Sequence, residues 1–118
     1  MFFYGKMMFK VDVIYKICSK DEWRIALEKG VYSGSSDDLR DGFIHFSAFD
    51  QVTKTLDKHF TGLKGLLLLK VSTEHLAPSV LKWEVSRNNE KFPHLYGDLD
   101  LDAVLSVDEL PDHDEPEE

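Results

Sequence analysis

The feature that most constrains the fold is an uninterrupted apolar run at residues 65–71, which contains four consecutive leucines. A half-buried strand alternates apolar and polar side chains, whereas a strand covered on both faces reads as a continuous apolar run. Gly65 at one end and Ser72-Thr73 at the other mark its limits. The run is far too short to cross a bilayer. It therefore predicts a central strand that is buried on both faces.

The length of the chain allows only one domain. At 118 residues it can build a single hydrophobic core and is too short for two. We place this domain at residues 13–107, with an amino-terminal extension at 1–12 and an acidic, disordered tail at 108–118. Met7 and Met8 are alternative start residues.

The negative charge of the chain is concentrated in the predicted tail. The formal net charge is -8, but residues 108–118 hold seven of the 22 acidic residues and no basic one, which leaves 15 acidic residues against 14 basic ones. A nearly neutral domain without a basic patch argues against a nucleic-acid partner. The single cysteine, Cys18, excludes an internal disulfide and is typical of a reducing compartment. With neither a signal peptide nor a membrane span, we expect a cytoplasmic protein without a membrane partner.

Two amphipathic helices are predicted in the first half of the chain. Ser19 and Glu22 have the spacing of a capping box, and Gly30 supplies the left-handed stop of the helix that they begin. A polar loop is predicted at residues 30–40. The second helix follows Ser47, which we assign as its N-cap. Its apolar face repeats at spacings of three and four, through Phe49, Val52, Leu56 and Phe60.

Strands are predicted for much of the remaining chain. Residues 12–18 form the first and residues 103–107 the last. Proline cannot donate to a ladder, so Pro93 predicts that residues 92–97 lie at a sheet edge or in an irregular conformation. Helices followed by several strands predict an α+β fold with a mixed or antiparallel sheet bent around a cleft. Residues 80–86 alternate in polarity, with three residues predicted to face inward: Leu81, Trp83 and Val85.

The strongest chemical signal is a histidine and a serine two positions apart on the predicted strand at residues 43–46. Strand side chains alternate between faces, so His45 and Ser47 share one face. Two interpretations of Ser47 stay open, because a capping hydroxyl is already bonded to backbone amides and yet can face a ligand. A second histidine, His94, follows Pro93 on a conformationally constrained segment. It is the first candidate to join His45 in a cleft.

Other polar residues beside apolar strands extend the candidate site, because a polar group there is costly unless it is paired or used. Glu84 either pairs with Lys82 or stabilises positive charge in a transition state. Ser35 belongs to a Gly-Ser pair that marks a turn or brings amides close to an anion. Three more residues are candidates for ligand binding: Arg87 for a phosphate, and Tyr32 and Tyr96 for a planar group.

Metal and covalent hydrolase sites are disfavoured by spacing. His45, His94 and Glu84 would leave an open position on zinc, but the sequence offers no local pair of ligands, so we predict no metal site. Ser47 does not stand in a nucleophile elbow, and Cys18 lies within the first predicted strand.

Six short segments carry a resemblance to a known family. They are Gly34-Ser35, residues 41–47, Gln51, His59-Phe60, residues 81–84 and residues 92–97. In this order and spacing they resemble the domain of unknown function 952 family, over roughly residues 13–105. The resemblance implies a small bacterial domain whose fold is similar to the ADP-ribosyltransferase fold, with a split, curved mixed β-sheet and two main helices.

Within that fold, residues 43–47 look like the His-x-Ser strand of the RNA 2'-phosphotransferases, which use NAD to remove a phosphate from RNA. The likeness implies NAD as a candidate cofactor. The first strand departs from that pattern, because Tyr15 and Lys16 stand where those enzymes usually have a histidine or an arginine. In an NAD-using version, His45 would orient the ribose or phosphate and Arg87 would bind phosphate. Tyr32 or Tyr96 would stack on the base, and Glu84 would stabilise an oxocarbenium-like state.

Two hypotheses of function remain open. The first is an NAD- or nucleotide-dependent transferase that takes a small phosphorylated molecule or nucleotide, with His45, Glu84 and His94 as catalytic residues. The second is a non-catalytic module on the same fold, which binds a small molecule or another protein. Fold alone does not decide between them.

Overall fold

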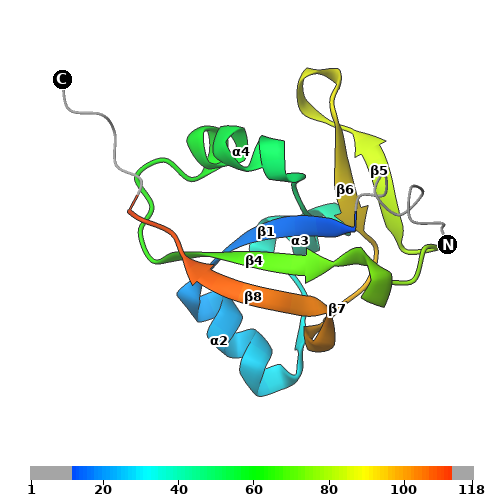
Figure 1. Cartoon of the computed structure of the whole chain (residues 1–118). Coiled ribbons are helices and arrows are strands. Elements are labelled where there is room, and N and C mark those ends of the chain that lie inside the picture. The colour runs from blue at the N-terminus through cyan, green and yellow to red at the C-terminus, as the bar shows by residue number, and fades with distance from the viewer. Residues whose placement is uncertain (1–11, 113–118) are drawn as a thin grey trace, which may run out of the picture.

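The computed structural model describes residues 12–112. Its first sheet has three antiparallel strands in the order β1-β4-β8 (Figure 1). These are β1 (Val13–Ser19), β4 (Leu66–Ser72) and β8 (Val104–Glu109). The apolar run at residues 65–71 is thus the middle strand, as predicted.

Strand β4 supplies side chains to hydrophobic clusters on both faces of this sheet. The larger of the two clusters contains Leu67, Leu69 and Val71 of β4, together with Ala26. The side chains between them face the other side of the sheet. There Leu66 and Leu68 pack with Val52 and Leu56 in the smaller cluster. Burial on both faces is the arrangement that a continuous apolar strand requires.

The second sheet is also antiparallel, in the order β3-β6-β5. It contains β3 (Ile44–His45), β6 (Lys91–Leu95) and β5 (Leu81–Val85). A short antiparallel pair joins β2 (Val31–Tyr32) to β7 (Leu99–Asp100). All strand pairs within residues 12–112 are therefore antiparallel, and the expectation of a mixed sheet is wrong.

Pro93 lies in the middle strand of the second sheet, so its assignment to an edge is wrong. Its carbonyl accepts a hydrogen bond from the Phe46 amide at 2.9 Å. In an antiparallel pair the reciprocal bond would run from residue 93 to Phe46, and proline cannot make it. Only one ladder bond is lost, because a residue has a single backbone N–H and the Pro93 carbonyl still accepts.

Three α-helices connect the strands. They are α2 (Lys20–Lys29), α3 (Ser36–Asp41) and α4 (Val52–His59). The capping box predicted for α2 is present, and Gly30 ends the helix in the left-handed conformation with φ +93°. Helix α3 lies within the stretch that we predicted as a loop. Short 3₁₀ helices complete the fold: η1 (Phe49–Gln51), η2 (Thr73–His75), η3 (Arg87–Asn89) and η4 (Leu101–Ala103).

The two sheets meet at a single bridge between Tyr15 of β1 and Ser47. The amide of each residue donates to the carbonyl of the other at 2.8 Å. Figure 1 shows α2 on one side of the β1-β4-β8 sheet, and α4 with the β5-β6 hairpin on the other. The seam between the sheets therefore lies on the side of α4.

The alternation of β5 predicted the inward position correctly for one of its three apolar residues. Leu81 packs against the larger hydrophobic cluster, as expected. Val85 is 58% exposed and Trp83 is 38% exposed, although both were expected to face inward. Glu84, on the opposite face, bonds to His94. Since β5 is the edge strand of its sheet, the alternation alone could not indicate which side chains are buried.

The last strand extends beyond the domain limit that we placed at residue 107. It reaches Glu109, and Leu110 packs against the smaller cluster. Residues 1–11 of the predicted extension and residues 113–118 of the predicted tail lie outside the described residues.

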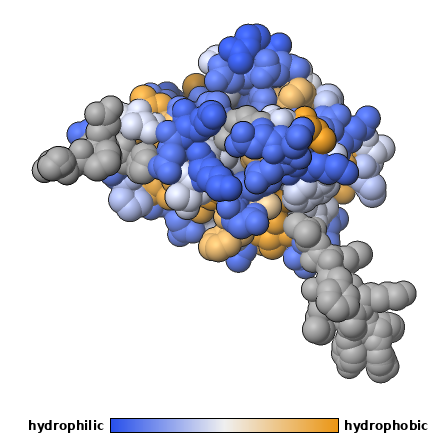
Figure 2. All heavy atoms as spheres, turned by 90° about the horizontal axis from the view of Figure 1, so that it is seen from above, coloured by the Kyte–Doolittle hydropathy of each residue, from blue (hydrophilic) through white to orange (hydrophobic). Residues whose placement is uncertain are grey.

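One face of the described part is largely polar. The face seen in Figure 2 carries mostly hydrophilic residues, with apolar ones in small separate patches. Within residues 12–112, no helix has the length and apolar character needed to cross a membrane.

Candidate functional site

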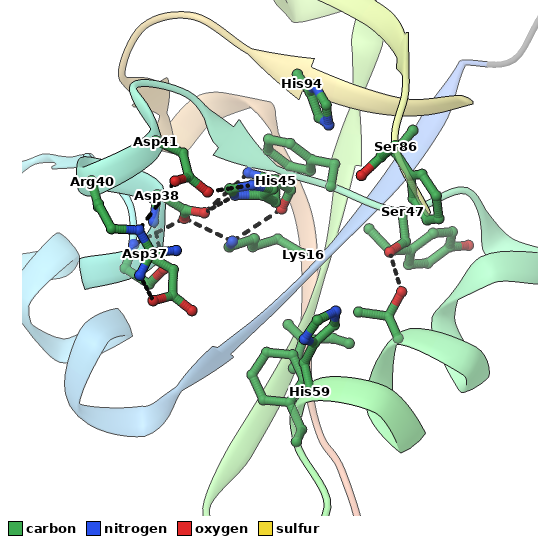
Figure 3. Close-up of a pocket in the computed structure, with 17 residues that line it drawn as sticks. Lys16, Asp37, Asp38, Arg40, Asp41, His45, Ser47, His59, Ser86 and His94 are labelled. Carbon is green, nitrogen blue, oxygen red and sulfur yellow. Dashed lines mark hydrogen bonds and ion pairs between the residues drawn. The ribbon is translucent and has the colours of Figure 1, made fainter. Parts of the chain in front are cut away.

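A pocket of about 250 Å³ lies along the seam between the sheets. Its walls come from β1, α3, β3, α4 and β6. In Figure 3 the aspartates of α3 gather on one side, Ser47 and Ser86 lie on the other, and His94 and His59 lie at opposite ends. Segments from most of the chain therefore converge on this pocket.

The His45 ring is held between two carboxylates of α3. Its Nδ1 lies 2.6 Å from Asp38 Oδ1, and its Nε2 lies 3.2 Å from Asp41 Oδ2. The backbone amide of His45 also donates to Asp38 Oδ1 at 3.2 Å. These contacts fix both the position and the orientation of the imidazole.

Asp38 forms a buried ion pair with Lys16 of β1. The Lys16 Nζ donates to Asp38 Oδ2 at 2.7 Å and to the carbonyl of His45 at 3.0 Å. The side chain of Lys16 is only 6% exposed and that of Asp38 only 2%. Burial raises the pKa of the Asp38 carboxyl, but the hydrogen bond with His45 and the charge of Lys16 outweigh it and hold that pKa well below its ordinary value. Asp38 is therefore ionised in the folded protein near neutral pH.

The start of α3 places Asp38 where these contacts can form. Ser35 is the N-cap, and its hydroxyl accepts from the Asp38 amide at 3.2 Å while Asp38 Oδ2 accepts from the Ser35 amide at 2.9 Å. This is a capping box in which an aspartate takes the usual place of glutamate. Gly34, with φ +111°, precedes it, and a Cβ there would come within 2.7 Å of Asp38 Cβ. The backbone at residue 34 thus makes room for Asp38.

His94 has a carboxylate partner of its own. Its Nδ1 lies 2.8 Å from Glu84 Oε1, and the same oxygen accepts a hydrogen bond from the Tyr96 hydroxyl at 2.6 Å. The hydrogen bonds from Tyr96 and His94 hold the pKa of Glu84 below its ordinary value. In return, the bond to Glu84 raises the pKa of Tyr96. His94 is only 5% exposed and lines the pocket.

The two imidazoles lie side by side because β3 and β6 are paired. His45 and His94 are directly opposite in the ladder, and their ring centroids are 5.5 Å apart. The Phe43 ring stacks on His94 at 4.1 Å and lies 4.6 Å from His45. Two carboxylate-held imidazoles therefore face one pocket, braced by a shared aromatic ring.

Four of the predicted residues line this pocket: Ser35, His45, Ser47 and His94. Glu84 and Tyr96 do not line it but are linked to it through His94. The structure describes the position of Arg87 in η3 but not its side chain.

Two predictions for individual residues are wrong. Tyr32 is 1% exposed in the core and is absent from the pocket lining, so it does not offer a ring face to a ligand there. Ser47 is not an N-cap, because Ala48 stands before η1 and Gln51 before α4. The Ser47 hydroxyl instead lies 3.2 Å from the Thr55 hydroxyl. An extra 3₁₀ turn moves the start of the helix away from Ser47.

Three residues of the site were not predicted: Lys16, Asp38 and Asp41. Lys16 interrupts the apolar pattern of the first strand, between Ile14 and Cys18 on the buried face. A cation in that position needs a buried partner, and this signal was available. The aspartates gave no such signal, because they lie in a short polar segment. Within residues 12–112, no group of three histidine, cysteine or acidic side chains has an arrangement suited to a metal ion.

The family assignment rests on a sequence profile described as a protein of unknown function (DUF952), which matches residues 17–107. The chain belongs to this family. The crystal structure of protein CC0527 from Caulobacter crescentus is 45% identical, with a TM-score of 0.80 over 84% of this chain and 86% of that one. Its solution NMR structure is 46% identical, with a TM-score of 0.73 over 83% and 84%. A comparison with curated proteins gives no match. The α+β fold of this DUF952 protein is thus shared with a solved relative.

Proposed function

We propose that this DUF952 protein binds a small phosphorylated molecule, of mononucleotide size or less, as the substrate of a transfer reaction. The observation that carries the proposal is the pair of imidazoles, 5.5 Å apart and each held by a carboxylate, on the wall of a single pocket. Perturbed and oriented titratable groups that converge in a pocket are typical of functional sites.

The charges around the pocket are compatible with an anionic ligand. Asp38 is paired with Lys16, and Arg40 lies 3.0 Å from Asp37 and 3.1 Å from Asp41. Each carboxylate of α3 therefore has a cationic partner, and Asp37 and Asp41 share one. The hydroxyls of Ser47 and Ser86 lie on the side of the pocket away from α3 (Figure 3). That side offers donors for phosphate oxygens without an opposing carboxylate.

An NAD-dependent transferase is the more specific form of this proposal, supported by the resemblance to ADP-ribosyltransferase-like proteins. The geometry changes its assignments. Tyr32 is in the core, and Glu84 lies behind His94, bonded to it and to Tyr96. The pocket volume of about 250 Å³ is also below the usual range of ligand pockets, which is roughly 300–1,000 Å³. A mononucleotide or a smaller phosphate therefore suits the pocket better than a whole dinucleotide.

A non-catalytic binding module is the second candidate, and one observation favours it. Both ring nitrogens of His45 already face carboxylates, so the ring has no free nitrogen for a ligand unless Asp41 moves. In this version the pocket binds its ligand and no bond is broken.

The test is a titration of ¹⁵N-labelled protein with inorganic phosphate, AMP and NAD, monitored by amide chemical shifts. We expect saturable shifts at Lys16, His45 and His94 with phosphate or AMP at millimolar concentration or below. The shifts should be lost in His94→Gln and kept in His75→Gln, since His75 is exposed in η2 and outside the pocket. Silence with all three probes, or shifts confined to another surface, would contradict the proposal. Bound AMP or NAD that stays intact in ³¹P spectra over days would favour the binding module.

A further inference from the structure

Glu84 holds two donors on a single oxygen. His94 Nδ1 and the Tyr96 hydroxyl both lie within 2.8 Å of Glu84 Oε1. A carboxylate accepts hydrogen bonds and does not donate them, so the His94 proton must be on Nδ1 for this contact to form. Lys82 is a charged neighbour of this group, with its Nζ 5.4 Å from the Tyr96 ring centre.

With the proton on Nδ1, the other nitrogen of a neutral His94 carries a lone pair. No partner for this Nε2 is found among the described residues, and the ring points into the pocket in Figure 3. His94 is also nearly fully buried. An acceptor that has no partner among the described residues and is aimed into a pocket is a place for a donor from a ligand or an attacking hydroxyl.

His45 is surrounded in the opposite manner. Its Nδ1 is hydrogen-bonded to Asp38 Oδ1 at 2.6 Å, and its Nε2 has an ion-pair contact with Asp41 Oδ2 at 3.2 Å. Both nitrogens can carry a proton toward these carboxylates at once only when the ring is doubly protonated. Lys16 faces the same cluster from β1, bonded to Asp38, and His94 faces it from β6. The two rings therefore have different hydrogen-bond requirements although they are neighbours.

We infer that the pocket holds its two histidines in opposite protonation forms, His94 as a proton acceptor and His45 as a proton donor, for cleavage of a phosphate ester. Glu84 and Tyr96 are positioning residues that act through His94. This assignment rests on the proposed function for its substrate, but the protonation forms belong to the free protein.

The reaction that this arrangement suits is attack on phosphorus by water or by a substrate hydroxyl. The attacking hydroxyl gives its proton to His94 Nε2 as its oxygen bonds to phosphorus. The ester P–O bond breaks, and its electron pair goes to the leaving oxygen, which takes a proton from His45 Nε2. Asp41 must first release that nitrogen, and its side chain is partly exposed at the end of α3. Proton exchange with solvent then restores both rings.

The test begins with the ligand-free protein. Long-range ¹H–¹⁵N correlation spectra distinguish the two neutral tautomers of a histidine from its doubly protonated form. At neutral pH we expect His94 to be neutral with its proton on Nδ1, and His45 to be doubly protonated, with assignments made from His94→Gln and His45→Gln. A His94 ring protonated on Nε2, or a neutral His45, would overturn the inference whatever the outcome of the ligand titration.

Variants separate positioning from folding. In Glu84→Gln we expect the His94 spectrum to show a mixture of tautomers, because the amide can donate as well as accept. Tyr96→Phe should give a smaller change, and Glu74→Gln, on exposed η2, should give none. Amide spectra confirm that each variant is folded. An unchanged His94 tautomer in Glu84→Gln would refute the role of Glu84.

Activity provides a second readout, with p-nitrophenyl phosphate as the probe. We expect release of p-nitrophenol to fall at least tenfold in both His94→Gln and Glu84→Gln, and Tyr96→Phe to shift the pH profile with a smaller loss of rate. Glu74→Gln should match the wild type. Hydrolysis that is equal in wild type and His94→Gln would overturn the acid–base assignment, as would a complete lack of hydrolysis by a protein that binds phosphate in the titration.

Discussion

At the scale of single residues, Asp38 is the side chain on which the site most depends. Its carboxylate accepts from Lys16, from the His45 amide and from the Ser35 amide, and it contacts the His45 ring. It comes from a helix of only six residues. Asp38 therefore links α3 to both β1 and β3, which form neighbouring walls of the pocket.

Removal of this carboxylate should be strongly destabilising. Asp38→Ala leaves the Lys16 ammonium buried without a counter-charge, and breaking a buried pair in this way costs about 3–5 kcal/mol. The neighbouring Asp37→Ala is the matched control, because its ion pair with Arg40 is exposed and contributes about 0–1 kcal/mol. Urea unfolding measures both. Similar midpoints for the two variants would show that the Lys16–Asp38 pair adds nothing to stability.

Acid sensitivity should also depend on Asp38. The pKa of its carboxyl is lower in the folded protein than in the unfolded chain, so its contribution to stability is complete above the unfolded value, near pH 4, and is lost as the pH falls below that. We expect the wild type to lose more free energy of unfolding between pH 6 and pH 3 than Asp38→Asn, which has no proton to bind at this position. Urea titrations at the two pH values give the comparison. Parallel losses would locate the acid sensitivity in other carboxyls.

At the scale of elements, the sequence predicted those whose own pattern shows how they are buried. Strand β4 reads as a continuous apolar run and α2 as a capped amphipathic helix, and both are confirmed. Helix α3 has no comparable pattern, because its one large apolar residue, Leu39, is 67% exposed. It is held by a capping box and by the buried contacts of Asp38. Those contacts depend on residues 22 and 7 positions away along the chain, which a local pattern does not contain.

The same reasoning explains which parts of the site were predicted. His45 and His94 each interrupt an apolar strand, and that local signal was sufficient to propose that they converge, as their 5.5 Å separation confirms. The carboxylate of Glu84 was assigned to chemistry, although the structure places it behind His94. Ser47 was misassigned because the 3₁₀ turn η1 separates it from α4. Element boundaries and tertiary partners, rather than residue types, were what the sequence could not specify.

The docking of α3 should require a glycine at residue 34. In Gly34→Ala the new Cβ meets Asp38 Cβ, and φ +111° is strained for any L side chain. We expect a loss of about 1–3 kcal/mol, with shifted His45 ring signals in NMR spectra. Gly62→Ala is the control, since φ there is +83° but nothing lies within 4 Å of its Cβ. It should show backbone strain without any change at His45. Unshifted His45 signals in Gly34→Ala would mean that α3 tolerates the contact by moving elsewhere.

At the scale of the whole molecule, the pocket lies where two antiparallel sheets meet at the bridge between Tyr15 and Ser47. The β1-β4-β8 sheet is covered on both faces by hydrophobic clusters. The β3-β6-β5 sheet carries the two histidines and leaves Trp83 and Val85 exposed. The pocket is thus supported by the better buried sheet and completed by the more exposed one, where local movements cost less free energy.

The single cysteine offers a probe of the well-buried sheet. Cys18 lies in β1 and is 1% exposed, and burial, followed by the charge of Glu22, raises the pKa of its thiol to about 12. A thiol reagent should therefore modify it only when the sheet opens. We expect labelling at neutral pH to be slow, and its rate to rise with urea with the slope of global unfolding. Asp38→Ala should label about two to four orders of magnitude faster, in proportion to its loss of stability. A rate independent of urea would show that β1 opens locally, and that the two sheets do not unfold as one unit.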